Sequence, residues 1–396
     1  MAAGYAAREL VQRGLGAGEL TIVSADDALP YERPPLSKSY LAGKDQETDI
    51  LINPADWYAQ HGIAVRLQTP IEAIDGKSRA LRTAAGEILT FENLLIATGA
   101  RARRLACPGS ESAQLFYLRS LADSRRLREA AAGARLAAVI GGGFIGMEVA
   151  SVLAQKKIET TLIVPEERVW SRVFTPAMSE FFEHYYAARG VRLLFGQTVV
   201  RMEHTELRSV VVLASGERIG CDLAVAGVGA EPVTELFQGS SLEVDNGIVV
   251  NEFLETNAQG MSAAGDVARY QDVLFGKRRR VEHWDNAVSQ GQHWATLMKG
   301  ERQAFVHVPY FFSDIFDLSY ELWGDAEGAT ETVVRGDATT SSFSVWWLKG
   351  ERLVAAFAMN RPEEERQLAP QWIQSRQAVA RDRLADAQRS LPEAAR

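Results

Sequence analysis

A chain of 396 residues with 46% hydrophobic and 24% charged residues is long enough for about two to three domains, and its composition excludes a disordered or fibrous protein. Its formal net charge of -8 argues against nucleic-acid binding, which needs clustered Lys and Arg. The two cysteines, Cys107 and Cys221, lie too far apart for a C-x-x-C dithiol or a cysteine zinc cluster. The sequence has no apolar run of membrane-spanning length and no signal-peptide pattern, so we expect a cytoplasmic protein without a membrane span.

The first predicted element is a helix over residues 4–13, where Ala and Leu recur at helical spacing. A β-branched strand follows over 21–23 and leads to the acidic pair Asp26 and Asp27. A helix followed by such a strand is typical of the second half of a βαβ unit, in which an acidic side chain at the strand end binds an adenosine ribose. We expect Asp26 to do so, and a solvated turn is the alternative.

The segment 30–38 places Arg33 and Lys38 beside three prolines. Because proline fixes its own backbone angle φ, this composition predicts a stiff loop that holds positive charge in place. Fixed positive charge can stabilise a negative charge that develops on a bound cofactor. If Arg33 and Lys38 are instead isolated surface charges, they contribute little to stability or to binding.

A complete βαβ unit is predicted between residues 136 and 167. A short apolar strand over 136–140 leads into a glycine motif, and a helix to Lys156 and a strand over 161–164 follow. The glycines of the motif are Gly141, Gly143 and Gly146. Their spacing lets the backbone turn tightly, approach a pyrophosphate and direct a helix N-terminus at its charge. The unit therefore predicts dinucleotide binding.

Two acidic residues, Glu166 and Glu167, follow the second strand of this unit. A carboxylate at this position accepts hydrogen bonds from the adenosine ribose of NADH. Arg168 and Arg172 lie close by in the sequence and could instead receive the 2′-phosphate of NADPH. The pattern favours NADH and leaves NADPH open.

The two units are related by an internal alignment that places Ala3 on Gly146. In this alignment Met1 falls on Phe144, so residues 136–143 have no counterpart near the N-terminus. We therefore expect the first unit to lack its first strand and its glycine loop, and we expect the true start codon to lie upstream of Met1. If the chain begins at Met1, we expect weak cofactor retention by the first unit.

The remaining sequence alternates between predicted sheet and short glycine segments. Predicted sheet at 87–96 ends in Ala97, Thr98 and Gly99, and a β-rich stretch at 199–226 ends in Gly227 and Gly229. Gly265 and Asp266 precede a predicted helix over 282–298. Residues 342–348 and 352–358 predict a hairpin, which a polar helix follows.

Together these motifs resemble the FAD- and NAD(P)H-dependent oxidoreductases of the glutathione-reductase fold. The resemblance is closer to the branch that contains ferredoxin reductases, monodehydroascorbate reductases and apoptosis-inducing factor, and it spans nearly the whole chain. The segments that carry it are 2–8, 30–38, 97–99, 141–148, 256–266 and 281–287. The segments 165–166, 171–176, 308–313 and 322–325 look most like monodehydroascorbate reductases and their bacterial relatives.

The resemblance implies an α/β fold with two Rossmann-like nucleotide-binding domains, one for FAD and one for NAD(P)H, and a C-terminal α+β domain. Residues 1–115 and 243–307 would form the FAD-binding domain. Residues 116–242 would form the NAD(P)H-binding domain, and 308–396 the C-terminal domain.

The resemblance also implies roles for individual residues. Lys38 would lie near the isoalloxazine and Glu148 near the nicotinamide, and these are the two expected catalytic residues. The other residues expected at FAD are Gly4, Asp26, Arg33, Ala97, Thr98, Gly99, Gly265, Asp266, Glu282, His283 and Trp284. The remaining expected cofactor-binding residues are Gly141, Gly143, Phe144, Ile145, Gly146, Glu166, Arg172 and Gly229. No metal site is expected.

We therefore expect an FAD-dependent NAD(P)H oxidoreductase without a redox-active disulfide. It would pass electrons to a ferredoxin-like protein or to a small acceptor such as monodehydroascorbate or a quinone. Because the first unit is incomplete, a flavin-poor NAD(P)H-binding sensor or interaction protein of the same fold is the alternative. The basic run 277–280 would either dock an acidic electron carrier or form a solvated loop.

Overall fold

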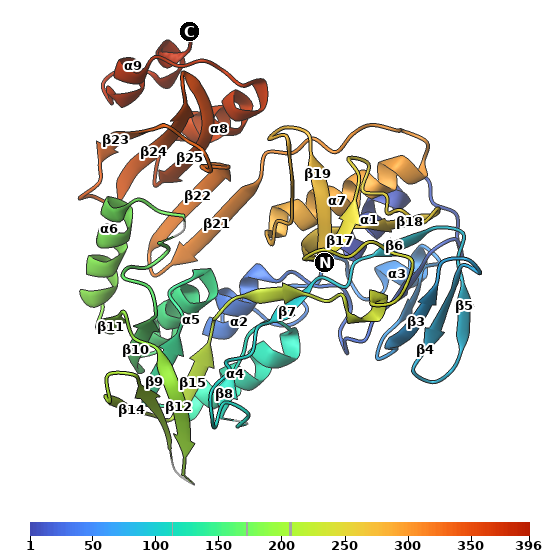
Figure 1. The fold of residues 1–396 in the computed structure, drawn as a ribbon, viewed down its shortest axis with the longest axis horizontal. Coiled ribbons are helices and arrows are strands. Elements are labelled where there is room, and N and C mark those ends of the chain that lie inside the picture. The colour runs from blue at the N-terminus through green and yellow to red at the C-terminus, as the bar shows by residue number, and fades with distance from the viewer. Residues whose placement is uncertain (113, 172, 206–207) are drawn as a thin grey trace. The chain divides into compact units, whose positions relative to one another are not determined.

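Figure 1 shows the computed structural model of the chain, which describes residues 1–112, 114–171, 173–205 and 208–396. The chain forms two compact units, each built from stretches that are separated in the sequence. Unit 1 contains Met1–Arg33, Gln46–Arg101 and Ala230–Pro309. Unit 2 contains Pro34–Asp45, Ala102–Gly229 and Tyr310–Arg396.

The regular elements of unit 1 are mostly short. Its α-helices are α1 (Ala2–Gln12), α3 (Trp57–Gln60) and α7 (Trp284–Met298), and its 3-10 helices are η2 (Glu235–Phe237) and η3 (Gly265–Val267). Its strands are β1 (Thr21–Val23), β2 (Ala64–Arg66), β3 (Ile71–Asp75), β4 (Ala80–Thr83), β5 (Ile88–Thr90), β6 (Leu94–Ile96), β7 (Ala100–Ala102), β16 (Ala230–Pro232), β17 (Ile248–Val250), β18 (Met261–Ala263), β19 (Ala268–Asp272) and β20 (Lys277–Arg279).

The packing of α1 against α7 forms part of the core of unit 1. Ala6 on α1 and Trp294 on α7 are buried in the same apolar cluster. Gly291 permits this close approach, because a Cβ atom there would lie 2.4 Å from the carbonyl oxygen of Ala2. The helices predicted over 4–13 and 282–298 are confirmed, and both begin two residues away from the predicted positions.

The predicted sheet at 87–96 is confirmed, and it consists of two short strands, β5 and β6, that belong to different sheets. β5 belongs to the antiparallel sheet β3-β4-β5, whereas β6 pairs in parallel with β18. Between them, the N–H of Phe91 donates to the carbonyl of Arg79, and the N–H of Leu94 donates to the carbonyl of Gly260. β5 and β6 belong to different sheets because each pairs with a different partner strand. A local sequence pattern does not show which strand that partner will be.

Unit 2 contains the longest strands, β24 and β25. Its helices are α2 (Ser39–Ala42), α4 (Leu121–Gly133), α5 (Phe144–Gln155), α6 (Pro176–Ala187), α8 (Glu363–Ser375) and α9 (Arg381–Ala385), with the 3-10 helices η1 (Pro34–Ser37) and η4 (Leu391–Ala394). Its strands are β8 (Leu115–Phe116), β9 (Leu136–Ile140), β10 (Glu159–Val164), β11 (Val191–Phe195), β12 (Val199–His204), β13 (Ser209–Leu213), β14 (Arg218–Cys221), β15 (Leu223–Ala226), β21 (Tyr310–Ile315), β22 (Leu318–Gly324), β23 (Glu331–Asp337), β24 (Ser342–Lys349) and β25 (Arg352–Met359).

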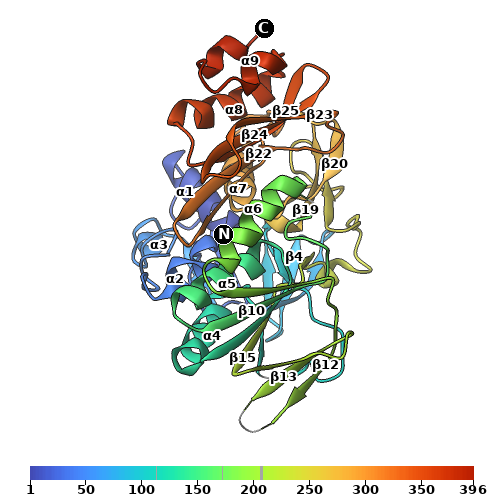
Figure 2. The same cartoon turned by 90° about the vertical axis from the view of Figure 1, so that its left-hand side faces the viewer.

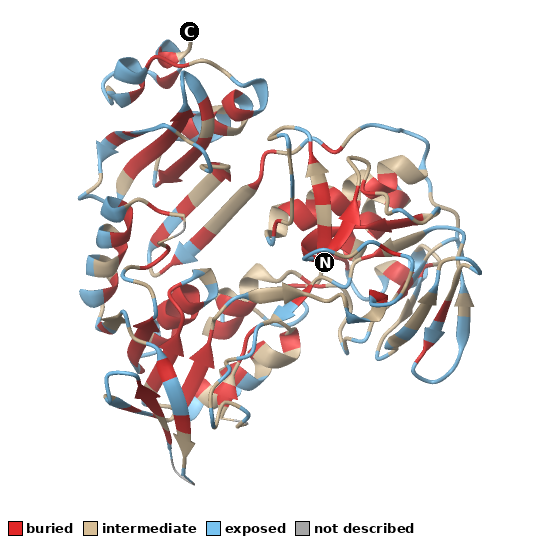
Figure 3. Cartoon of the chain, viewed as in Figure 1, coloured by how far each residue is buried: buried red, intermediate tan, exposed pale blue. Residues whose placement is uncertain are grey.

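A parallel sheet of order β11-β10-β9-β15-β8 holds the predicted βαβ unit. β9, β10 and β15 are buried along almost their whole length, as the red strands in Figure 3 show. Continuous burial of this kind is typical of parallel strands that are covered on both faces. Because α5 connects β9 to β10, the predicted unit between residues 136 and 167 is confirmed.

An antiparallel sheet of order β21-β22-β25-β24-β23 makes up most of the C-terminal part. β24 and β25 form the predicted hairpin, and α8 is the predicted polar helix. In Figure 2, α8 and α9 lie beside this sheet.

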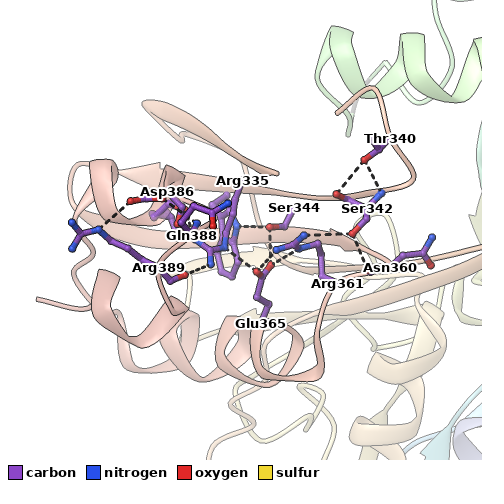
Figure 4. A network of polar contacts seen from close by, with 12 residues as sticks. Arg335, Thr340, Ser342, Ser344, Asn360, Arg361, Glu365, Asp386, Gln388 and Arg389 are labelled. Carbon is purple, nitrogen blue, oxygen red and sulfur yellow. Dashed lines mark hydrogen bonds and ion pairs between the residues drawn. The ribbon is translucent and has the colours of Figure 1, made fainter. Parts of the chain in front are cut away.

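A buried polar cluster connects the segment 386–389 to this sheet (Figure 4). Arg335 on β23 and Glu365 on α8 are both almost fully buried, and Arg335 Nε donates to Glu365 Oε1 at 2.8 Å. The other guanidinium nitrogens of Arg335 donate to the carbonyl oxygens of Asp386 and Arg389, each at 2.6 Å. The cluster therefore holds the segment after α9 in place.

Candidate functional site

The glycine motif forms a tight backbone loop between β9 and α5. Gly141 has a φ of 112°, and a Cβ atom there would lie 2.3 Å from the carbonyl oxygen of Gly227. A Cβ atom on Gly146 would lie 1.9 Å from the carbonyl oxygen of Gly141. Side chains at these two positions would therefore destroy the loop, which explains why the motif needs glycine there.

The start of α5 is open to a ligand. Gly143 is the N-cap residue of α5, it is exposed, and a Cβ atom built on it meets no other atom within 4 Å. Ile145 in the first turn is 39% exposed. Backbone N–H groups at the start of a helix attract phosphate, so the residues present fit the pyrophosphate of a dinucleotide. Phe144 lies beside this opening and packs on Phe311 of β21, with ring centroids 3.8 Å apart.

Glu148, in the second turn of α5, is the centre of a buried charged cluster. The Nζ atom of Lys38 lies 3.0 Å from Glu148 Oε1, and the side chains are 13% and 4% exposed. Ser313 Oγ donates to Glu148 Oε1 at 2.5 Å, and Ser37 Oγ donates to Glu148 Oε2. The Lys38 ammonium also lies 4.8 Å from the ring centroid of Phe312. The structure thus brings the two predicted catalytic residues into direct contact.

The surroundings of Glu148 have a low dielectric. Tyr320 and Tyr186 are buried nearby, and burial followed by the negative charge of Glu148 raises the pKa of Tyr320 well above its usual value. Burial is also the largest cause of the raised pKa of Tyr186. In such surroundings a cation beside Glu148 is strongly attracted to it and is held in a fixed place.

Glu166, Glu167 and Arg168 follow β10 and are the described candidates for contacts to the adenosine side of the coenzyme. Arg168 donates through Nη1 to Ser179 Oγ at 2.7 Å and through Nη2 to the carbonyl oxygen of Ser171 at 2.8 Å. Its guanidinium is therefore engaged in holding the segment before α6. Glu166 is half-buried and Glu167 is exposed. Arg172 lies outside the described residues.

Two further glycines follow β15, the neighbour of β9 in the sheet. Gly227 faces the loop, because a Cβ atom on it would lie 3.0 Å from the backbone nitrogen of Gly146. Gly229 has a φ of 107° and open space around it. Both lie past the carboxyl end of a parallel strand, where ligands of open α/β sheets bind.

In unit 1, the segments 97–99 and 265–266 follow adjacent parallel strands. β6 and β18 pair in register, and the N–H of Ala264 donates to the carbonyl of Ile96 at 3.0 Å. Ala97, Thr98 and Gly99 follow β6, and Gly265 and Asp266 follow β18. The structure therefore brings these five predicted residues to one edge of unit 1.

The turn at Gly265 is built for close backbone approach. Gly265 has a φ of 77°, and its N–H donates to Gln290 Oε1 at 2.8 Å. Asp266 is 5% exposed. A buried carboxylate at a strand end has the chemistry needed to accept hydrogen bonds from the hydroxyls of a ribitol chain, so this edge fits FAD.

Three more predicted residues lie in helix α1 and in the segment that follows strand β1. Asp26 follows β1 and accepts a hydrogen bond from the hydroxyl of Tyr31 at 2.9 Å. The guanidinium of Arg33 lies 5.4 Å from the ring centroid of Tyr31. Gly4 is buried in α1, where a Cβ atom would lie 2.7 Å from Pro30 Cβ. The surroundings of Gly4 thus show a packing role for this glycine.

The side chain of Glu32 is held by two donors, one of them at the start of α7, and the sequence did not predict this contact. Tyr5 of α1 donates its hydroxyl to Glu32 Oε1, and Trp284 donates Nε1–H to Glu32 Oε2. The ring centroids of Tyr5 and Trp284 are 6.3 Å apart at an angle of 86°. Glu282 and His283 directly precede α7. The cluster joins three segments that are far apart in the sequence, and that separation is why no local signal could have found it.

The cysteines and possible metal ligands give no further site. Cys107 and Cys221 are both free, and burial raises the pKa of the Cys221 thiol to about 11. Within the part of the chain that the structure describes, no group of His, Cys, Asp and Glu side chains could hold a metal ion. Among the same described residues, no helix is long and apolar enough to cross a membrane.

Two protein-family models together match most of the chain. The family described as pyridine nucleotide-disulphide oxidoreductase matches residues 1–291, and the family described as reductase C-terminal matches residues 310–395. Monodehydroascorbate reductase 4 of Arabidopsis thaliana is 35% identical over 403 residues, covering 96% of this chain and 82% of the relative. A monodehydroascorbate reductase of Solanum lycopersicum is 35% identical, with 93% and 91% of the two chains covered.

Solved structures give similar results. The putidaredoxin reductase in a covalent complex with putidaredoxin superposes with a TM-score of 0.93 at 32% identity, covering 99% of this chain and 95% of that one. A ferredoxin reductase of Rhodopseudomonas palustris superposes with a TM-score of 0.95 at 31% identity, covering 100% and 98% of the two chains.

Proposed function

The chain belongs to the pyridine nucleotide-disulphide oxidoreductase family, and from that premise we propose how its residues bind their cofactors and which acceptor they serve. The protein is an NAD(P)H-dependent flavoprotein reductase, and its cofactors are FAD and NAD(P)H. When bound, FAD would supply the chemistry of accepting a hydride from NAD(P)H and of onward electron transfer. The resemblance to this fold expected from the sequence is confirmed.

The observation that carries the proposal is the contact between Lys38 and Glu148 close to the glycine loop. Gly141, Gly143 and Gly146 would hold the pyrophosphate of the coenzyme with backbone N–H groups, and Glu166 would accept hydrogen bonds from its adenosine ribose. This assignment favours NADH, because Arg168 is already engaged elsewhere.

Lys38 would supply positive charge beside the isoalloxazine, and Glu148 would hold that ammonium in place. Ser37 and Ser313 donate to the two carboxylate oxygens and so fix the orientation of Glu148. Because these partners are buried, the cation needs no rearrangement when negative charge develops near it.

In unit 1, the FAD would be held by the strand ends described above. Asp266 would accept hydrogen bonds from the ribitol and Asp26 from the adenosine ribose, while Arg33 would contact the phosphates. Ala97, Thr98 and Gly99 would line the cofactor, and Glu282, His283 and Trp284 would form the edge of its pocket. The domain boundaries at 115, 242 and 307 stay predictions.

The electron acceptor that we propose is a ferredoxin-like protein, and the alternative is a small acceptor such as monodehydroascorbate or a quinone. The near-complete superposition on ferredoxin reductases supports the first, and the sequence relatives support the second. The test is stopped-flow reoxidation of the NADH-reduced protein by a ferredoxin and, separately, by the monodehydroascorbate radical. Fast reoxidation by one of them identifies the acceptor class, and equally slow reoxidation by both contradicts each.

A further inference from the structure

Two arginine side chains of the basic run 277–280 are largely buried in unit 1, which the sequence does not indicate. Arg279, at the end of β20, forms an ion pair with the buried Asp272 of β19. The side chain of Arg280 is only 11% exposed, whereas Arg278 is exposed. Two of the four cations therefore point into unit 1, and the run is not a solvated loop, because residues 277–279 form β20.

Arg280 lies where three segments of unit 1 meet. β17, β19 and β20 form one sheet, and the starts of β17 and β19 lie at the same edge as the end of β20. Arg280 Nε donates to the carbonyl oxygen of Asn246, before β17, at 3.0 Å. Its Nη1 donates to the carbonyl oxygen of Asp266, before β19, at 3.1 Å, and also to the carboxylate of Glu282, which follows β20.

The backbone before β17 is shaped to receive this side chain. Asn246 and Gly247 have φ values of 45° and 127°, both outside the range that most residues adopt. A Cβ atom on Gly247 would lie 2.7 Å from the carbonyl oxygen of Val267 and 3.0 Å from Arg280 Cδ. Gly247 thus leaves the space that the Arg280 stem and the backbone of η3 occupy together.

We propose that Arg280 is a positioning residue for FAD, because its guanidinium keeps the backbone of Asp266 and the carboxylate of Glu282 in register with each other. The inference rests on the proposed function, in which both residues belong to the FAD site. Charge-assisted hydrogen bonds are stronger than neutral ones, and the planar fork of a guanidinium reaches several acceptors at once. A lysine at this position would reproduce the charge and only part of the geometry.

The test measures how fast FAD leaves the purified holoenzyme, followed as the rise in free-flavin fluorescence after dilution. Arg280→Ala should release FAD about tenfold faster than the wild type, which is the effect of losing about one hydrogen bond to a charged group. Arg280→Lys should fall between the two. Arg278→Ala is the matched control, because it removes the same charge from an exposed position of the same run and should leave the rate unchanged.

A second measurement separates positioning from general loss of stability. The visible circular dichroism of bound flavin reports its surroundings, and it should change in Arg280→Ala but not in Arg278→Ala. Methylguanidinium added to Arg280→Ala should slow the release of FAD again. If Arg280→Ala does not fold, Arg280→Lys takes its place, and faster release from that variant supports the inference.

Two results would overturn this inference alone. They are release at the wild-type rate from the Arg280 variants, and an equal acceleration in Arg278→Ala. A wild-type protein that holds no FAD would instead contradict the proposed function, so the two failures are distinguishable.

Discussion

Glu148 is a buried carboxylate in unit 2 and Glu32 a half-buried carboxylate in unit 1, and the two accept hydrogen bonds from different kinds of partner. Glu148 is paired with the Lys38 ammonium and accepts hydrogen bonds from serine hydroxyls. Glu32 accepts from the neutral donors Tyr5 and Trp284. Each carboxylate joins chain segments that are distant in the sequence.

Because their partners differ, the two carboxylates depend on different interactions. A buried carboxylate with a cation depends on charge, because removing one partner leaves the other charge uncompensated. A carboxylate held by neutral donors depends on hydrogen-bond geometry, and its partners can adapt to a neutral amide. The first arrangement suits a site that stabilises developing charge, and the second suits a joint between segments.

The largest effect is expected for Lys38→Met. Loss of the ammonium should destabilise unit 2 by about 3–5 kcal/mol, because Glu148 is then left buried without a counter-charge. It should also slow flavin reduction by NADH by about 100-fold, because fixed positive charge near the flavin is lost. Thermal unfolding and anaerobic stopped-flow absorbance measure the two effects.

Two further variants control this prediction. Lys44→Met, at an exposed lysine of the same unit, should change neither quantity. The double variant Lys38→Met with Glu148→Gln should recover stability but not the rate of flavin reduction. A double variant that regains the rate would show that Lys38 has no electrostatic role.

A smaller effect is expected for Glu32→Gln. The amide can still accept from Trp284, so stability should fall by about 1 kcal/mol, measured by chemical unfolding. Glu92→Gln, at an exposed glutamate of the same unit, is the control. A loss as large as that of Lys38→Met would contradict the distinction between the two clusters.

The same variant has a pH signature. Burial first, and then the hydrogen bond and charge of Glu32, raise the pKa of Tyr5 above its usual value. A raised pKa in the folded state means that the neutral phenol contributes stability below about pH 10, and that this stability is lost as the pH rises further. Glu32→Gln should lower the pKa of Tyr5 and weaken the alkaline loss of stability. Ultraviolet titration of the tyrosines measures the shift, and an unchanged curve would argue against the Tyr5–Glu32 contact.

The smallest effect on stability is expected at the half-buried Glu166. Glu166→Ser should leave the free energy of unfolding nearly unchanged and shift the kcat/KM ratio of NADH to NADPH by about tenfold toward NADPH. Glu167→Ser is the matched control. If only the Glu167 variant changes the ratio, the ribose contact belongs to Glu167.

The sequence was most informative where function depends on local spacing. The loop from Gly141 to Gly146, with strand and helix on either side, could be recognised because all its parts lie within one βαβ unit. Gly265 and Asp266 precede helix α7 as predicted, whereas the internal alignment that places Ala3 on Gly146 stays a prediction. The incomplete first glycine loop stays a prediction.

The sequence was least informative where a site depends on distant partners. Lys38 and Glu148 were named separately, but their ion pair and the contribution of Ser313 could not be predicted, because the three residues come from different segments of unit 2. The alternative of a solvated loop at 277–280 was wrong for a related reason. A local pattern records four cations, whereas the acceptors of Arg280 at Asn246 and Asp266 lie on other strands.

We propose that the protein holds FAD and that NADH reduces this flavin at a site that includes Lys38. The decisive experiment is anaerobic stopped-flow mixing of the purified protein with NADH, with the visible absorbance of the bound flavin as the signal. We predict rapid bleaching in the wild type and markedly slower bleaching in Lys38→Met at equal flavin content. A wild-type protein without flavin absorbance, or with flavin that NADH does not bleach, would contradict the account.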